Sequence, residues 1–452
     1  MKKTKLGRKI VSIIQCLLLI CFSNSMLGCA YTSKYSFESV KSSDKIFYNE
    51  QFLEVSEKYE ELAKRGDKNN ALWNNQLGTI YLAQGNREKA LDSLLKAHYL
   101  MNNVSAFKEL EVRAISWSGS ENKKAYKGDP YEKAINSLYV GLLLYEKGDY
   151  DNALAAFRNG ILADSDSKEE KYKSDFTILY LLASRISKKS GDETLSKDFE
   201  KEVQELKEGR RIASLNVKDN AAKEIVNLNN NTILVLELGK GPSKYRTGKH
   251  GEKAVISKRD YKTYEPKVII DGKRDTSIKV YYDADVYFQA NTRGGREMDG
   301  ILKGQAKFKD DASKTSVTML KASNEMIDSA NRTRAANPYA DTTGQLAAAG
   351  VLALFSLGSA VTSSITNPKA DIRYWSLLPA YIYVFPLSLK PGMHKFGISI
   401  EKGMSSEIIN EFEVNIKEGR DNVIFKRIIK YKISSDVPVT TLKYLKLSPV
   451  YK

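Results

Sequence analysis

The sequence predicts an α+β fold, in which a helical repeat region precedes an antiparallel β-sandwich-like domain with a helical insertion. Apolar and small residues recur at helical spacing over residues 45–215. Short β-branched runs bounded by Gly and Pro begin near residue 222. A helix-like stretch, 311–366, divides these runs. We therefore expect one β domain built from residues 222–310 and 370–450.

The first 28 residues have the pattern of a secretory signal peptide. Five basic residues before position 10 are followed by an apolar core from Ile10 to Phe22, and no acidic residue precedes Cys29. A spanning helix needs roughly 20 apolar residues, and this core is shorter. We therefore expect the segment to be removed during export.

The end of this segment, Met-Leu-Gly-Cys at residues 26–29, resembles the lipobox of bacterial lipoproteins. The resemblance implies cleavage between Gly28 and Cys29 and attachment of a lipid to the Cys29 sulfur. The protein would then be lipid-anchored to the membrane outside the cytoplasm, with residues 29–44 as a Ser- and Lys-rich flexible tether. Ala30, in place of Asp, implies the outer membrane facing the periplasm if the source has two membranes. The alternative is an ordinary signal peptide cut nearby.

Charge and cysteine content narrow the chemistry of the mature chain. All three cysteines lie at or before residue 29, so none is left for catalysis, a disulfide or a zinc site. Removing the five basic residues of the signal lowers the basic total from 71 to 66, against 55 acidic residues, for a net charge of +11. This surplus favours contact with anionic lipid or glycan, and export makes nucleic acid an unlikely partner. The last 36 residues carry nine basic and three acidic side chains, either as a solvated face or as an anion-binding surface.

Two helical segments share one pattern of small and large residues. Leu77, Gly78, Tyr81, Gly85, Ala90, Leu94 and Ala97 form the first copy, and Gly141, Leu144, Gly148, Tyr150, Ala153 and Phe157 form the second. The pattern resembles the tetratricopeptide (TPR) repeat. The aligned glycines are 63 positions apart instead of the usual 34, which predicts an insert between the copies. A third, degenerate pair includes Tyr180, Ala183 and Gly191, and an unrelated helical bundle is the alternative.

The TPR resemblance implies a concave groove that binds a protein or peptide partner in the envelope. The inner face of each first helix would carry the contacts, which fall at Asn75, Thr79, Leu82, Leu138, Leu142 and Tyr145. The second copy is apolar at these positions, so packing within the protein is the competing interpretation.

Six short runs predict the strands of the β domain. They are NNNTILVLELGKGPSKY, TSIKVYYDADVYFQA, AYIYVFPLSL, HKFGISIE, INEFEVNI and NVIFKRIIKYKIS. Between them, the Ala- and Gly-rich stretch Leu346 to Val361 is too short to span a membrane comfortably. It is either a buried helix or hairpin packed on the β domain, or a segment that touches membrane or a partner helix through small residues.

The string NPKADIRYWSLLPAYIYVFPLSLKPGMHKFGISI, residues 367–400, is the most distinctive of the chain. It resembles a signature in a family of uncharacterised bacterial lipoproteins with TPR-type helices, through Ala370, Asp371, Arg373, Trp375, Leu378, Pro379, Pro391, Gly392 and His394. The earlier GKGP motif also fits that family. Members are often encoded near lipoproteins that activate peptidoglycan synthases, which implies an envelope role.

This block also has a physical interpretation of its own. Asp371 and Arg373 lie on one face of an extended segment and are placed to pair, and Trp375 alternates beside them. Pro379 and Gly392 punctuate two strands. We expect structural roles for these five residues, and a ligand site is the alternative.

The remaining motifs predict no catalytic residue, metal site or cofactor. LGKGPSKY lacks the spacing of a P-loop, the three histidines lack metal-ligand spacing, and no G-x-S-x-G stretch occurs. The sequence thus predicts a non-enzymatic envelope lipoprotein that acts as a protein-interaction scaffold through its repeats, in cell-envelope or peptidoglycan assembly. A glycan- or lipid-modifying enzyme of the envelope is the alternative, although no paired carboxylates suggest one. A purely structural assembly factor is the third hypothesis.

Overall fold

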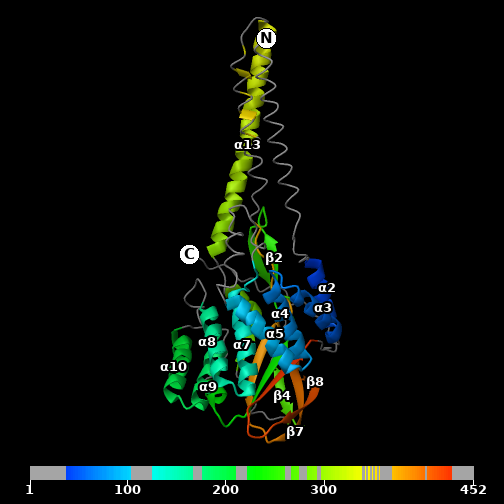
Figure 1. The fold of residues 1–452 in the computed structure, drawn as a ribbon, viewed down its shortest axis with the longest axis vertical. Coiled ribbons are helices and arrows are strands. Elements are labelled where there is room, and N and C mark those ends of the chain that lie inside the picture. The colour runs from blue at the N-terminus through cyan, green and yellow to red at the C-terminus, as the bar shows by residue number, and fades with distance from the viewer. Residues whose placement is uncertain are drawn as a thin grey trace.

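The computed structural model describes residues 37–102, 125–165, 176–209, 221–259, 266–273, 282–292, 297–337, 369–402 and 405–429, with single residues between 342 and 356. Over these residues the fold is a mixed α+β fold, as the sequence predicts (Figure 1). The signal segment 1–28, the predicted lipidation site Cys29 and the C-terminal part of the predicted β domain after residue 429 lie outside the described residues.

Helices fill the first half of the chain and pack side by side in chain order. They are α2 (Phe37–Tyr48), α3 (Phe52–Lys64), α4 (Asn70–Ala83), α5 (Arg87–Asn102), α7 (Pro130–Lys147), α8 (Tyr150–Asp164), α9 (Ile178–Lys189), α10 (Glu193–Gly209) and α11 (Ala221–Val226). α11 lies inside the region predicted to begin the β domain.

Two of the helical hairpins close in the same way. A Cβ on Gly78 of α4 would lie 2.4 Å from the Leu94 γ-carbon of α5, and a Cβ on Gly141 of α7 would lie 2.3 Å from the Phe157 ring of α8. Each glycine therefore allows a large side chain of the second helix to sit against the backbone of the first. The turn between α7 and α8 is made by Gly148, whose φ of 83° is a left-handed conformation that favours glycine.

The prediction that residues 29–44 form a flexible tether is wrong for residues 37–44, because α2 begins at Phe37. Asp44 of α2 is buried, and its carboxylate accepts hydrogen bonds from Ser376 Oγ at 2.7 Å and from Arg259 Nη1 at 3.2 Å. Residues 37–48 are thus helical, and the hydrogen bonds of Asp44 connect the C-terminal part of this helix to the β region.

The described strands of the β region form three sheets. The largest has the strand order β5–β6–β1–β9, with β1 (Thr232–Leu238), β5 (Tyr282–Asp285), β6 (Tyr381–Leu387) and β9 (Asn422–Ile428). The second has the order β4–β7–β8, with β4 (Pro266–Ile270), β7 (Gly392–Lys402) and β8 (Ser405–Ile416). A separate hairpin joins β2 (Ser243–Thr247) and β3 (Lys253–Ser257).

The prediction of a purely antiparallel domain is wrong at one pairing. β1 is antiparallel to β6 but parallel to β9, with Thr232 opposite Asn422. Parallel neighbours need a long connection, and here β6, β7 and β8 all lie between β1 and β9 in the sequence.

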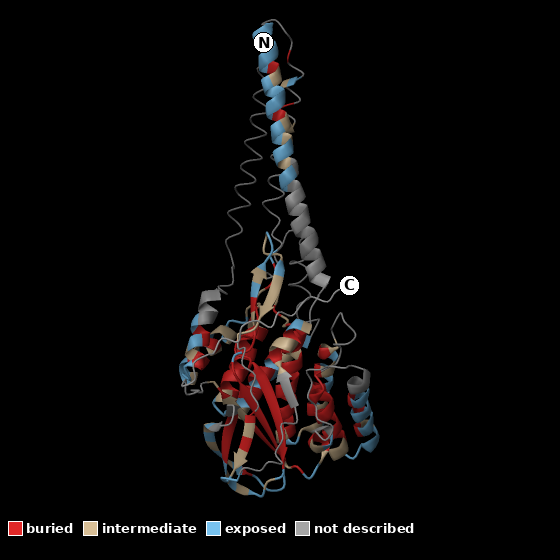
Figure 2. Ribbon diagram, turned by 180° about the vertical axis from the view of Figure 1, so that it is seen from behind, coloured by how far each residue is buried: buried red, intermediate tan, exposed pale blue. Residues whose placement is uncertain are grey.

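Both faces of the four-stranded sheet are covered. Ile233 and Val235 of β1 belong to the core formed with the helices, whereas Leu234 and Leu236 pack with Phe396 and other residues of the second sheet. The order of layers is therefore helices, four-stranded sheet and three-stranded sheet, and every residue of β1 is buried (Figure 2). The helical region 45–215 and the predicted β domain consequently share one hydrophobic core.

Two helices replace predicted β structure. After β5 the chain turns into α12 (Val286–Thr292), because the Asp285 carboxylate accepts the backbone N–H groups of Tyr287 at 2.9 Å and Phe288 at 3.2 Å. The helical insertion, predicted over 311–366, already begins at residue 297 as α13 (Glu297–Ala336). This 40-residue helix contains no proline and is rich in good helix formers.

α13 extends away from the layered body (Figure 1). Ser323 Oγ donates a hydrogen bond to the Ala349 carbonyl at 2.9 Å, and Ser316 Oγ donates to the Ser356 carbonyl at 3.0 Å. Ala349 and Ser356 of the stretch Leu346 to Val361 thus contact α13, whereas one of the two interpretations of the sequence places the stretch on the β domain. None of the helices within the described ranges combines the length and the apolar character needed to cross a membrane.

Candidate functional site

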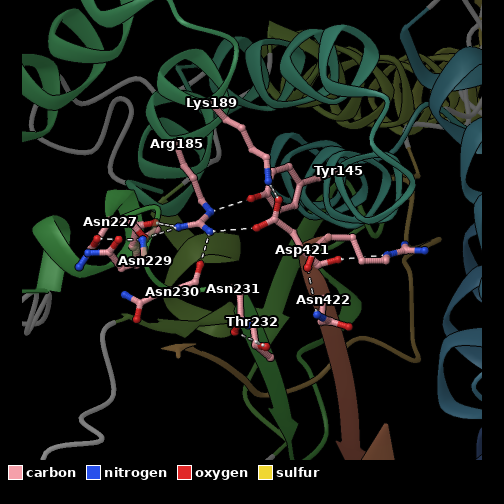
Figure 3. Close-up of polar contacts among 12 residues, drawn as sticks. Tyr145, Arg185, Lys189, Asn227, Asn229, Asn230, Asn231, Thr232, Asp421 and Asn422 are labelled. Carbon is pink, nitrogen blue, oxygen red and sulfur yellow. Dashed lines mark hydrogen bonds and ion pairs between the residues drawn. The ribbon is translucent and has the colours of Figure 1, made fainter. Parts of the chain in front are cut away.

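The six positions predicted to line a partner groove are buried within the chain. Asn75, Thr79, Leu82, Leu138, Leu142 and Tyr145 are between 0% and 6% exposed. Thr79 Oγ1 accepts a hydrogen bond from Trp375 Nε1 at 2.9 Å, and Tyr145 Oη accepts one from Arg185 Nε at 2.8 Å (Figure 3). The expectation that these residues contact a separate partner is therefore wrong in this structure for five of the six, because other parts of the same chain cover them; Leu82 lines the pocket described below.

The distinctive block at 367–400 supplies part of this cover. Trp375 is 1% exposed and meets the Tyr139 ring edge-on, with centroids 6.0 Å apart. Gln76 of α4 donates to Ser376 Oγ at 2.9 Å and accepts from the Leu377 N–H at 3.2 Å. Residues 375–377 thus contact α4 through side-chain and backbone hydrogen bonds, as a bound peptide would.

An ion pair between Asp371 and Arg373 fixes the backbone conformation at the start of the block. Arg373 Nε lies 2.9 Å from both carboxylate oxygens of Asp371, and Arg373 Nη1 donates to Asn69 Oδ1 at 2.8 Å. Burial alone would raise the pKa of Asp371, but the charge and hydrogen bonds of Arg373 outweigh it and lower that pKa to about 2. The pair is therefore ionised at neutral pH.

The block also meets the GKGP motif. The Gly241 N–H donates to the Leu378 carbonyl at 2.8 Å, and a Cβ on Gly241 would lie only 2.8 Å from the Pro379 carbonyl oxygen. Gly392 begins β7 with a φ of 127°, which favours glycine. Two segments that the family resemblance connects are thus neighbours in space.

Glu132 of α7 is a fully buried carboxyl beside Trp375. It accepts hydrogen bonds from Tyr126 Oη at 2.6 Å, from the Asp129 N–H at 2.6 Å and from the Trp375 N–H at 2.5 Å. Burial, and then the nearby charge of Asp129, raise the pKa of Glu132 to about 7, although Lys244 and Tyr126 oppose the rise.

This raised pKa predicts a pH-dependent stability. The folded chain binds the Glu132 proton more tightly than the unfolded chain, whose carboxyl has the ordinary pKa of about 4.5. The stabilisation by this proton is complete below the unfolded pKa and is lost as pH rises through 7. Between pH 4.5 and 7.5 we expect the free energy of unfolding to fall by on the order of 1–3 kcal/mol from this group.

Urea unfolding of the wild type and of Glu132→Gln across this pH range measures the effect. The difference between the two curves isolates Glu132, because His98, whose pKa is lowered by burial, contributes to both. Two parallel curves would show that Glu132 does not titrate in this range.

A pocket of about 360 Å³ lies at the edges of the four-stranded and three-stranded sheets. Its walls come from the α4–α5 turn, from β8 and from β9, which are the last strands of the three-stranded and four-stranded sheets. We name it the basic pocket, and it is lined by Leu82, Ala83, Gln84, Gly85, Arg87, Glu146, Phe412, Glu413, Val414, Asn415, Lys417, Arg420 and residues 422–427.

Cations predominate in the basic pocket. It contains Arg87, Lys417, Arg420, Lys426 and Arg427 against two carboxylates, those of Glu146 and Glu413. Among the carboxylates of the described residues, Arg87 Nε lies 3.9 Å from Glu146, and Arg427 Nη1 lies 3.4 Å from Glu237. The pocket is therefore placed to attract an anion.

Two of the three guanidinium groups of the pocket, those of Arg87 and Arg427, are incompletely satisfied. Arg87 Nη1 and Arg427 Nε are buried without a hydrogen-bond partner among the described residues. Burial lowers the pKa of Arg87 and of Lys426, and their heads lie over the Phe425 and Phe412 rings at 4.8 Å and 4.5 Å. A negative charge in the pocket would offset the cost of burying these cations.

The sequence identified only part of this site. Lys417, Arg420, Lys426 and Arg427 belong to the basic C-terminal stretch that we considered as an anion-binding surface. Arg87 lies more than 300 positions earlier, and no spacing rule connects it to them. Its placement follows from the packing of the α4–α5 turn against β9.

The histidines occupy separate structural positions. His98 Nδ1 hydrogen-bonds to Asn136 at 2.8 Å, and His394 Nδ1 hydrogen-bonds to Asp271 at 2.7 Å. Within the described ranges, no three His, Cys, Asp or Glu side chains are grouped so as to hold a metal ion.

Comparisons with family models, with curated proteins and with solved structures found no match to this chain.

Proposed function

We propose that this chain is a non-enzymatic lipoprotein of the cell envelope that binds an anionic partner in the basic pocket. The observation that supports the pocket most directly is the convergence of five basic side chains, two of which have buried N–H groups without partners. Residues 375–377 already contact Thr79 and Gln76 on the α4 side of the predicted helical groove. The partner surface is therefore assigned to the sheet edge instead of the helices.

In this proposal the TPR-like hairpins act as a scaffold. The recurring contacts of Gly78 with Leu94 and of Gly141 with Phe157 support the assignment to the TPR type. The helices hold the central sheet from one side and contribute Arg87 to the pocket. Binding at this edge would link the anchored protein to another component in cell-envelope or peptidoglycan assembly.

The membrane anchor rests on the sequence at residues 26–29. Mass spectrometry of the native protein is expected to show that residues 1–28 are absent and that Cys29 carries lipid. An unmodified thiol at Cys29, or a retained signal segment, would contradict the anchor without affecting the pocket.

Reversing charge in the pocket is expected to weaken binding of anionic probes at least tenfold at low salt. Lys417 and Arg420 are exposed, so Lys417→Glu with Arg420→Glu changes the charge by four units with little cost in stability. Binding of fluorescent polyglutamate and of phosphatidylglycerol vesicles would be measured at several salt concentrations.

The matched control carries the same charge change at a distance. Lys197 and Lys201 are exposed on α10, which lies on the other side of the molecule from β8 (Figure 1). Lys197→Glu with Lys201→Glu should retain most of the binding. An equal loss in both double variants would mean that net charge alone attracts the probes, and would exclude a defined site.

A further inference from the structure

The basic pocket runs along an unpaired strand edge. Among the described strands, β9 has β1 as its only neighbour in the sheet. The Asn422 N–H donates to Asn231 of the β1 side at 2.9 Å, whereas the Val423 carbonyl accepts from Arg87 Nη2 at 3.2 Å in the pocket. Because alternate residues of a strand direct their backbone groups to opposite sides, Phe425 and Arg427 direct theirs outward, as Val423 does.

The length of this edge matches a short extended peptide. Six consecutive residues of β9, 422–427, line the pocket. At about 3.3 Å per residue they extend over roughly 17 Å. An open edge of this kind is a template for one more strand, and backbone pairing at such an edge is a recurring mode of peptide recognition.

The charge of the pocket indicates which kind of peptide can bind there. The five basic and two acidic side chains of the pocket favour a peptide that carries carboxylates. The chain's own residues 430–452 contain five basic residues and one acidic residue, so their charge opposes entry. The β9 edge of a second copy is basic for the same reason, through Lys426 and Arg427.

We propose that the basic pocket receives an acidic peptide segment of another protein, about six residues long, which adds to β9 as an extra strand. The peptide backbone pairs with the outward groups of Phe425 and Arg427. Its carboxylates contact Lys417, Arg420 and the unpartnered Nη1 of Arg87. This inference rests on the proposed function, since it names the anionic partner of the same site.

Backbone methylation of a probe peptide tests the strand pairing. The probe is a fluorescent peptide of alternating Glu and Val, in an unmodified form and in two forms methylated at one or the other set of alternate backbone nitrogens. The binding partner is the mature chain, and binding is measured by fluorescence anisotropy. One methylated form should bind at least tenfold more weakly, because its pairing nitrogens are blocked, and the other should bind like the unmodified peptide.

Hydrogen exchange gives an independent readout. The amides of Phe425 and Arg427 should exchange faster than those of Ile424 and Lys426 in the free protein and should become protected when the unmodified peptide binds. Equal binding of both methylated forms, or no new protection at these two amides, would overturn strand addition.

The outcomes separate this inference from the proposed function. If Lys417→Glu with Arg420→Glu weakens binding but methylation has no effect, the result supports the anion site and contradicts strand addition. If the double variant changes the binding of no anionic probe, the result contradicts both the anion site and strand addition. Preference for phosphatidylglycerol vesicles over the peptide, or peptide binding that requires removal of residues 430–452, would also overturn the peptide assignment.

Discussion

Replacing Trp375 with alanine is expected to lower the free energy of unfolding by about 3–5 kcal/mol. The indole is 1% exposed and lies between the helices and the four-stranded sheet, where its ring contacts Tyr139. Its loss opens a cavity in the core that the two regions share. It also removes the hydrogen bond from Trp375 Nε1 to Thr79.

Urea unfolding followed by circular dichroism measures this change. Tyr99→Ala is the control, because Tyr99 is a large aromatic residue that is 60% exposed on α5, and we expect a change within about 0.5 kcal/mol. Trp375→Phe should fall between the two, since it keeps part of the ring and loses the hydrogen bond. A cost below 1 kcal/mol for Trp375→Ala would show that the block does not pack between the layers.

Replacing Arg185 with alanine should have an effect of similar size, about 3–5 kcal/mol. Arg185 is 1% exposed, and its guanidinium joins α9 to the segment before β1 and to Asp421 (Figure 3). It donates to the Ile225 carbonyl at 3.0 Å, to the Asn227 carbonyl at 2.7 Å and to the Asn230 carbonyl. Asp421 keeps Lys189 as a partner in the variant, but these three acceptors lose the guanidinium.

A second variant identifies which interaction matters. Arg185→Met restores apolar volume but supplies no donor, so it should be nearly as destabilising as Arg185→Ala. Arg65→Ala is the control, because Arg65 forms an exposed pair with Glu61 that contributes at most about 1 kcal/mol. Thermal or urea unfolding of the four proteins gives the comparison. If Arg185→Met recovers wild-type stability, the carbonyl contacts contribute little.

The sequence predicts the elements better than it predicts their contacts. Apolar runs located β1 and β6, because a strand covered on both faces is apolar throughout. The repeated pattern of small and large residues located α4 and α7, which are buried on nearly all sides. The sequence pattern wrongly predicts β structure after Asp285, since the capping of α12 by Asp285 is a local effect that competes with a β-branched pattern.

The periodicity of the sequence does not predict which distant residues contact one another. Asn75 and Thr79 look like groove residues because the TPR resemblance places them on the inner face of a first helix. In the structure their partners are Met101, Asn136 and Trp375, which lie from 26 to 296 positions away. Likewise, no local pattern brings Arg87 to β9, because that contact depends on how the turn after α4 packs.

The position of β9 at the end of the described chain affects how the polypeptide reaches its native state. Residues 37–209 are synthesised well before residues 422–428, which complete one side of β1. Until then the inner faces of the helices and of β1 lack part of their cover, and distant pairings of this kind form slowly. The nascent protein would therefore need protection from aggregation and proteolysis until β9 is in place, and a product truncated before residue 422 would remain a target for quality control.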